Sequence, residues 1–388
     1  MPAVRVGIVS SYPPTHCGIG EYTRMLAAAL RSVDPGVEVL VFSDRSLREP
    51  WVNDYAGARV VPLFERGSGA GVEDLPDALA EAGGVDVLHV QHDYSLYGYS
   101  DAVLRAALRA REEGLAARVV FTMHTVHHPY TPEREALGLQ SRLGPVDAVV
   151  VHSPLQEFEL RSQGVPGSRL ARIPHGTRFN PYLGLPRHQL LQRLGLGSLR
   201  GALVVVPGFL KRDKGLDTLL EALRLLGGGG GPAPTLVVAG EVWDRGLLGT
   251  LEEIGRLVNL VLLERYLEHR ELLMLLAAAD LVLLPYRHTR FYSVSGMLHL
   301  ALGGMRPVIG TRVPKLAELY QYAPRLTTPP GSPGALARLL RWALRHYETV
   351  VTYMSFLYSY AARTEWRRVA RRHLRLYRRL LRGGHAAG

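Results

Sequence analysis

The chain has 388 residues, of which 47% are hydrophobic and 21% are charged, a composition typical of a soluble globular protein with two or three domains. Its single cysteine, Cys17, excludes a disulfide scaffold, and the longest apolar run, 272–285, is shorter than the ~18 residues of a membrane span. The start of the chain is expected to form a buried strand rather than a signal peptide, so we expect a cytoplasmic protein.

The formal net charge of +11 is concentrated at the C-terminus. Residues 356–388 contain nine arginines and one acid, Glu365, and account for +8 of that charge. The remainder is close to neutral, so no nucleic-acid partner is expected. Only three of the 46 basic residues are lysines: Lys211, Lys214 and Lys315. Two of these lie within one loop, which indicates that a compact point charge is needed there.

Short apolar runs alternate with amphipathic stretches along most of the chain. The expected strands are 4–10, 37–42, 85–90, 118–123, 148–151, 203–207, 235–239, 260–263, 281–284 and 307–310. The expected helices are 21–31, 102–113, 154–163, 216–226, 271–279 and 332–345. Apolar strands without polar alternation, separated by helices, predict parallel sheets that are covered on both faces. The fold class is therefore α/β, with two doubly wound, Rossmann-like domains.

The predicted domains are 1–178, 179–358 and a basic C-terminal helix over 359–388 that packs back on the first domain. Apolar residues of that helix recur every three or four positions from Trp366 to Leu380, with arginines between them. Two interpretations stay open: packing of this stripe on the protein body, which we favour, and binding to an anionic membrane surface. The second would make the protein peripheral at the inner membrane face.

The segment 11–22 joins the first expected strand to the first expected helix and carries Gly18 and Gly20. Glycines at a helix start let backbone N–H groups approach an anion. A dinucleotide fingerprint is the alternative, with Asp44 in the ribose position. It is disfavoured because the turn before Gly18 is too long and because Thr23 replaces the third glycine.

Two histidine-rich segments, 89–93 and 124–128, each follow or end an expected strand. Their HxxH spacings would suit a metal, although no carboxylate or cysteine set completes such a site. The alternative is that one or two histidines hydrogen-bond a polar ligand, with His124 the first choice. We expect no bound metal at these histidines.

Two further segments place polar groups where a helix begins. In 206–217 a strand is followed by a basic loop that brings Lys214 to a helix N-terminus, a position suited to a diphosphate. In 291–301, Ser293, Ser295 and Gly296 precede a helix, which directs hydroxyls and backbone amides at a ligand. Simple N-capping by Ser293 or Ser295 is an equally good explanation.

Together these segments resemble the GT-B glycosyltransferases of family 4. The matching pieces occur in order along nearly the whole chain: 12–22, 90–94, 122–125, 173–176, 208–215 and 295–308. The resemblance implies a nucleotide-diphosphate sugar held mainly by the second domain, an acceptor held by the first, a cleft between them and a retaining reaction. It implies no metal or other cofactor, because basic residues and helix N-termini hold the diphosphate.

The resemblance also implies roles for single residues. Lys214 would neutralise the leaving diphosphate and His124 would touch the donor sugar, which makes these two the catalytic candidates. The other donor-binding candidates are Gly18, Gly20, Lys211, Ser293, Ser295, Gly296 and Glu318, the last as a ribose or base contact. His92 and Asp93 would lie on the acceptor side.

The chain departs from the family pattern at three points. Phe209 follows the phosphate-loop glycine where the family has an arginine, so Lys211 or Arg212 would have to replace it. The usual pair of glutamates falls on Tyr292 and Leu300, and a further expected glycine is Met305.

Our leading hypothesis is a retaining transferase that moves a hexose from a GDP- or UDP-linked sugar to a hydroxyl of a glycan, a lipid-linked glycan or a small polyol. The alternative is a GT-B protein that binds a nucleotide or glycan without catalysis, because both family glutamates are absent.

Overall fold

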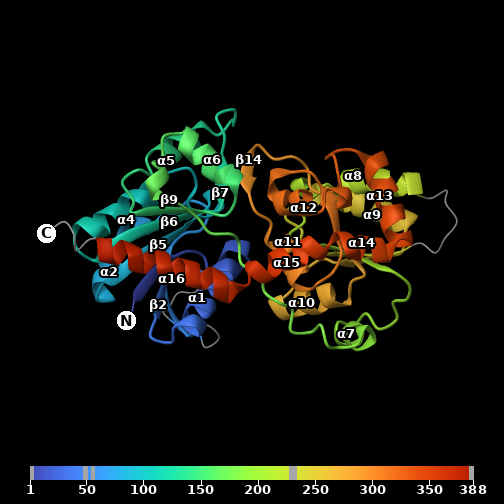
Figure 1. Cartoon of the computed structure of the whole chain (residues 1–388), viewed down its shortest axis with the longest axis horizontal. Helices are drawn as coiled ribbons and strands as arrows, with labels where there is room; N and C mark the ends of the chain where they lie inside the picture. The colour runs from blue at the N-terminus through green and yellow to red at the C-terminus, as the bar shows by residue number, and fades with distance from the viewer. Residues whose placement is uncertain (1–3, 47–50, 54–56, 227–233, 384–388) are drawn as a thin grey trace. The chain divides into compact units, whose positions relative to one another are not determined.

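The computed structural model describes residues 4–46, 51–53, 57–226 and 234–383, and the chain divides into two compact units (Figure 1). Unit 1 comprises Met1–Gly176, Arg290–Val294 and Trp366–Gly388, and unit 2 comprises Thr177–Thr289 and Ser295–Glu365. The first unit thus ends close to the expected boundary at 178. The expected third segment, 359–388, begins inside a helix of unit 2, so that residues 359–365 belong to that unit.

Unit 1 is built on a sheet whose strands run parallel, except for β3 at one edge. The strand order is β3 (Trp51–Asn53), β4 (Ala58–Phe64), β2 (Glu38–Asp44), β1 (Arg5–Val9), β5 (Val85–His92), β6 (Ala116–Met123), β8 (Ala148–Val151) and β9 (Leu170–Arg172). The helices are α1 (Gly18–Val33), α2 (Leu75–Glu81), α3 (Tyr94–Tyr97), α4 (Ala102–Glu112), α5 (Arg134–Ser141), α6 (Pro154–Ser162) and α16 (Trp366–Gly383), with 3-10 turns at Val72–Asp74 and Gly167–Arg169.

Successive residues of these strands enter two different hydrophobic cores, one on each face of the sheet. In β5, Val87 packs with α1 and α16, whereas Leu88 and Val90 pack with α2, α4 and α6. This alternation follows from the two-residue period of a strand. It explains why the strands are apolar throughout, as parallel strands covered on both faces must be.

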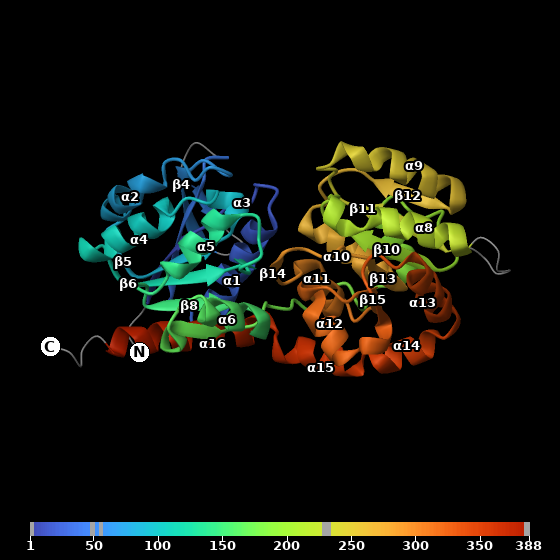
Figure 2. The same ribbon diagram turned by 90° about the horizontal axis from the view of Figure 1, so that it is seen from above.

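Unit 2 has a second parallel sheet with a single core. Its strand order is β12 (Leu260–Leu263), β11 (Thr235–Ala239), β10 (Leu203–Pro207), β13 (Leu281–Leu284), β15 (Val308–Thr311) and β16 (Thr327–Thr328). The helices are α7 (Arg187–Arg193), α8 (Leu216–Leu226), α9 (Leu248–Leu257), α10 (His269–Ala278), α11 (Gly296–Gly303), α12 (Ala317–Tyr322), α13 (Pro333–Arg345), α14 (Tyr347–Tyr353) and α15 (Ser355–Arg363). The 3-10 turns are Arg212–Lys214, Arg245–Leu247, Pro314–Leu316 and Pro324–Leu326. Figure 2 shows α8 and α9 side by side next to this sheet. Two Rossmann-like α/β units confirm the predicted fold class.

The C-terminal helix α16 completes unit 1, where it runs beside α1 (Figure 1). Trp366, Val369, Leu374 and Tyr377 are all buried in the core that α1 shares. The apolar stripe therefore packs on the protein, which is the interpretation that the sequence favours. None of the described helices is long and apolar enough to cross a lipid bilayer.

A five-residue segment of the predicted second domain, Arg290–Val294, belongs to unit 1 instead. Its strand β14 (Phe291–Ser293) pairs antiparallel with β7 (Thr125–His127), so that Ser293 lies opposite Thr125. The side-chain amide of Gln156 donates to the Tyr292 carbonyl at 3.4 Å. This pairing joins residues far apart in the chain, and for that reason the local pattern does not reveal it.

Candidate functional site

Lys214 lies in unit 2 in the loop between β10 and α8. Its Nζ donates a hydrogen bond to the Tyr286 hydroxyl at 3.0 Å and lies 4.3 Å from the centre of that ring. Burial lowers the pKa of the Lys214 amine to about 8, and the neighbouring Asp213 carboxylate limits the decrease. The amine is therefore mostly charged at pH 7, although it is only 7% exposed. A buried charge of this kind is suited to an anionic ligand.

Two glycines set the shape of this loop. Gly208 has φ +99°, and a Cβ there would lie 3.2 Å from Lys214 Nζ and 3.0 Å from the Met297 side chain. Gly215 has φ +67°, and its Cβ would approach the Pro285 carbonyl oxygen to 2.0 Å. Both positions therefore require glycine. The backbone at Gly208 consequently runs close to the Lys214 amine.

Tyr286 is the centre of a polar cluster in unit 2. Its hydroxyl lies 3.3 Å from Ser295 Oγ, and Lys315 Nζ lies 5.7 Å from its ring centre. Lys315 pairs with Asp213 at 3.0 Å. Burial raises the pKa of Asp213, but Lys315 and Lys214 more than offset this effect and hold the pKa below its usual value, so this carboxyl is ionised. The charged groups around Tyr286 are therefore two ammonium groups and one carboxylate.

The N-terminus of α11 adjoins this cluster. Ser295 is its N-cap and accepts a hydrogen bond from the backbone N–H of Leu298 at 3.3 Å, and the helix begins at Gly296. N-capping therefore accounts for Ser295. The same residue also contacts Tyr286, so the helix N-terminus and the Lys214 amine are linked through one phenol. Both features favour an anion.

Glu318 on α12 is also buried in unit 2, at 5% exposure. Its Oε1 lies 3.6 Å from His299 Nε2. Its Oε2 is buried and has no hydrogen-bond partner among the described residues. A carboxylate oxygen without a partner is suited to accept from a ligand hydroxyl. The predicted ribose contact of Glu318 stays a prediction.

In unit 1, α1 begins at Gly18, directly after the loop that follows β1. A Cβ at Gly18 would meet nothing within 4 Å, whereas one at Gly20 would lie 3.3 Å from the Tyr12 backbone. Close packing on this loop therefore explains Gly20. No such contact requires a glycine at position 18. The approach of the Gly18 backbone to an anion stays a prediction.

His92 and Asp93 end β5 in different surroundings. The His92 ring is fully buried and stacks on Tyr97, and burial lowers its pKa to about 4. Its ring thus faces the core, and the acceptor-side prediction rests on Asp93. The half-buried Asp93 accepts from Ser95 N–H at 2.9 Å and from the Thr125 hydroxyl at 2.7 Å. These bonds hold its carboxylate in one orientation.

His124 belongs to a cluster of rings around Tyr22. The centres of His124, His152, His175 and Trp366 all lie between 4.7 and 5.3 Å from that of Tyr22. Burial, together with His152 and His175, lowers the pKa of His124 well below its usual value. Its ring is therefore neutral, and Nε2 donates to the Gln91 side-chain oxygen at 2.9 Å. Contact of His124 with a donor sugar stays a prediction.

Ser293, predicted to bind the donor together with Ser295, lies in unit 1 on β14. Its hydroxyl is buried and has no hydrogen-bond partner among the described residues. The two serines are therefore parts of different units, although only one residue separates them. Within the described ranges, no group of three or more His, Cys, Asp or Glu side chains could hold a metal ion.

Models of known protein families match residues in both units. Residues 17–179 match the model of Glycosyltransferase Family 4, and residues 201–346 match that of Glycosyl transferases group 1. The chain belongs to the family 4 (group 1) glycosyltransferases. A search of curated proteins finds no match.

Solved structures show that this glycosyltransferase has the GT-B fold. Sucrose-phosphate synthase from Thermosynechococcus elongatus is 20% identical, with a TM-score of 0.76 over 98% of this chain and 100% of that chain. HepE from Anabaena in complex with UDP-glucose is 17% identical, with a TM-score of 0.71 over 99% and 100% of the two chains. A UDP-forming trehalose-phosphate synthase from Burkholderia xenovorans is 14% identical, with a TM-score of 0.68 over 97% and 99%.

The basic residues that follow Phe209 both have partners within unit 2. Phe209 packs on Trp243, with ring centres 4.5 Å apart. Lys211 Nζ lies 3.8 Å from the centre of the same indole, and Arg212 pairs with Asp244 at 2.8 Å. The second cation beside Tyr286 is Lys315 instead. Donor binding by Lys211 stays a prediction.

Sequence reasoning missed Tyr286 and Lys315 as members of the site. Tyr286 follows β13 without any motif, and only its hydrogen bond to Lys214 identifies it. Lys315 could have been found from the scarcity of lysine, because two of the three lysines in the glycosyltransferase flank Tyr286.

Proposed function

We propose that this glycosyltransferase transfers a hexose from a UDP- or GDP-linked sugar to a hydroxyl acceptor, and that the polar cluster around Tyr286 in unit 2 binds the donor diphosphate. The buried, charged amine of Lys214 carries this proposal. When the bond from the anomeric carbon to the diphosphate oxygen breaks, negative charge develops on the leaving group. A fixed ammonium group and a helix N-terminus stabilise such charge. Retention of configuration is proposed from the family resemblance.

Support for a uracil nucleotide comes from the structural neighbours. HepE has been solved with UDP and with UDP-glucose. Glu318 Oε2, which lacks a hydrogen-bond partner among the described residues, is the proposed acceptor for a ribose hydroxyl. We propose UDP as the first nucleotide to test and GDP as the second.

Thermal unfolding with UDP, GDP, ADP, NAD or no ligand tests this proposal. A ligand that binds only the folded protein, at 100 times its Kd, stabilises it by about 2.7 kcal/mol. We expect a clear rise in Tm with one nucleoside diphosphate and none with NAD. If no diphosphate raises Tm, the proposed donor site is wrong. Binding without transfer to any acceptor would favour the non-catalytic alternative.

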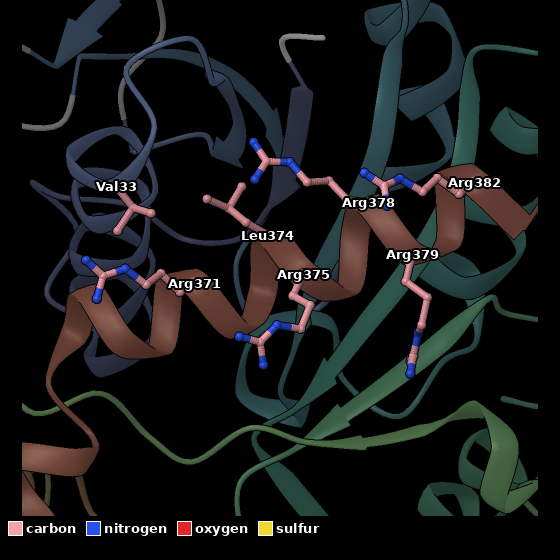
Figure 3. A pocket seen from close by; sticks show the side chains of 7 residues that line it. All are labelled: Val33, Arg371, Leu374, Arg375, Arg378, Arg379 and Arg382. Atoms are coloured by element: carbon pink, nitrogen blue, oxygen red, sulfur yellow. The ribbon is translucent and has the colours of Figure 1, made fainter. Parts of the chain in front are cut away.

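We further propose that the basic surface of α16 associates with anionic lipid headgroups. Arg371, Arg375 and Arg379 are exposed and form no ion pair with any described residue, whereas Arg378 pairs with Asp34. These arginines, with Arg382 and two apolar residues, line a surface pocket (Figure 3). Figure 3 shows Arg375 and Arg379 on one side of the helix axis and Arg378 on the other. Because the apolar side of α16 is buried in unit 1, we expect electrostatic attachment without insertion.

Changing Arg371, Arg375 and Arg379 together to glutamine is expected to weaken binding to vesicles rich in phosphatidylglycerol about 100-fold, because each basic side chain near such a surface contributes about 1 kcal/mol. Vesicle sedimentation measures the effect, which should diminish at high salt. The control changes three exposed arginines of unit 2 to glutamine: Arg193, Arg338 and Arg345. Equal loss of binding in both variants would contradict a specific role for α16.

A further inference from the structure

Unit 1 exposes aromatic rings next to Asp93, and these rings rest on a layer of buried ones. The side chain of Tyr99 is 38% exposed, and its ring stacks on buried Tyr94 with centres 5.1 Å apart. Tyr94 and Phe291 both contact His127, at 4.9 and 5.6 Å between ring centres. The Tyr99 ring thus packs on buried Tyr94, which itself packs on His127.

A second group of rings surrounds His128. Tyr130 is 86% exposed, and its ring centre lies 6.1 Å from that of His128. Tyr292 from β14 lies on the same imidazole at 5.9 Å. Phe291 and Tyr292 are successive residues of β14, so their side chains lie on opposite faces of the β14–β7 pair. We call the two rings on the His127 side, Tyr99 and Phe291, the aromatic surface.

Carboxylates lie beside these rings. Burial raises the pKa of the Tyr99 phenol, and Glu133, Asp93 and Glu135 raise it further. The groups that shift the pKa of Tyr99 are thus all carboxyls, while the cation Arg290 acts on Glu133. A phosphorylated or otherwise anionic ligand is disfavoured at this position, whereas a neutral ligand with hydroxyl donors is favoured.

Two of the carboxylates are held in place before any ligand binds. Glu133 accepts from the Thr131 hydroxyl, and that hydroxyl oxygen lies 2.9 Å from His127 Nδ1. Asp93 is held by Ser95 and Thr125. Fixed acceptors lose little entropy when a ligand hydroxyl donates to them, so the arrangement is preorganised.

We propose that the aromatic surface binds an unphosphorylated carbohydrate as the acceptor, an inference that rests on the proposed transferase function. A sugar ring has C–H faces that pack on the exposed aromatic rings and hydroxyls that donate to Asp93 and Glu133. A lipid chain would leave those carboxylates desolvated without donors. Under this proposal, Asp93, which is predicted to lie on the acceptor side, accepts a hydrogen bond from a sugar hydroxyl.

The full chain and its Tyr99→Ala variant test this proposal without turnover. Saturation-transfer NMR with maltose, cellobiose and lactose is expected to show contact with the wild-type protein. The signal of the bound sugar should weaken roughly three- to tenfold in Tyr99→Ala, because one stacked ring is lost. Tyr99→Phe keeps the ring and should bind like the wild type. The control is Tyr347→Ala in unit 2, where the side chain is 36% exposed.

Kinetics with a neutral acceptor supply the second readout. Tyr99→Ala is expected to raise the acceptor KM while leaving the rise in Tm with UDP or GDP unchanged. Equal behaviour of wild type and Tyr99→Ala towards all three sugars would overturn the inference, as would binding of glucose 6-phosphate in preference to them. Failure of every nucleotide to raise Tm would instead overturn the donor site, so the two failures are distinguishable.

Discussion

Replacing Lys214 with alanine is expected to lower kcat/KM for the donor sugar about 100- to 1,000-fold, the usual cost of removing one group that stabilises developing negative charge. The reason is that Lys214 Nζ is buried and bonded to Tyr286, whereas Lys315, the other ammonium group near that ring, is paired with Asp213. Steady-state release of the nucleoside diphosphate measures the effect.

Folding should survive this change, because removing a buried cation also removes its desolvation cost. The Tm of Lys214→Ala without ligand is therefore expected to stay near that of the wild type. In the wild type, kcat/KM should fall as the pH rises above about 8, because Lys214 then loses its proton. Lys214→Arg should shift that fall to higher pH. Wild-type turnover by Lys214→Ala would refute the assigned role.

Acidification is expected to destabilise unit 1 strongly. Burial lowers the pKa of His92 and of His373 to about 4, whereas each would titrate near 6.5 in the unfolded chain. The unfolded chain therefore binds more protons between these values, and stability is lost as the pH falls from about 6.5 to about 4. Each histidine should remove ~3 kcal/mol across that window, and the loss should level off below it.

Urea unfolding at several pH values between 7 and 4 measures this loss. His373→Gln should flatten the dependence on pH, since the buried ring that resists protonation is gone. His188→Gln provides a control because His188 is exposed. If His373→Gln and His188→Gln show the same dependence as the wild type, burial of His373 is not the cause.

Much of the fold could be predicted because it depends on local pattern. The strands from Leu203 to Pro207 and from Thr235 to Ala239 lie where their apolar runs place them. The position of Lys214 could be predicted for the same reason, because a strand, a glycine-bounded loop and a helix follow one another directly.

The parts that could not be predicted depend on contacts between distant residues. Ser293 and Ser295 resemble one N-terminal motif, yet Ser293 pairs with Thr125 in unit 1 while Ser295 caps α11 in unit 2. Tyr22 contacts His152 directly after β8, His175 near residue 176 and Trp366 of α16. No local spacing encodes either arrangement, because each arises from the tertiary packing of separate segments.

The place of α16 in unit 1 has a consequence for how the protein is made. Val369, Leu374 and Tyr377 complete a core that β1 and α1 begin, although they are translated only after unit 2. During synthesis the nascent first unit therefore presents an uncovered apolar face for the whole time that unit 2 is being translated. Truncation before Trp366 is therefore expected to leave that apolar face exposed and to yield an aggregating fragment rather than a free-standing domain.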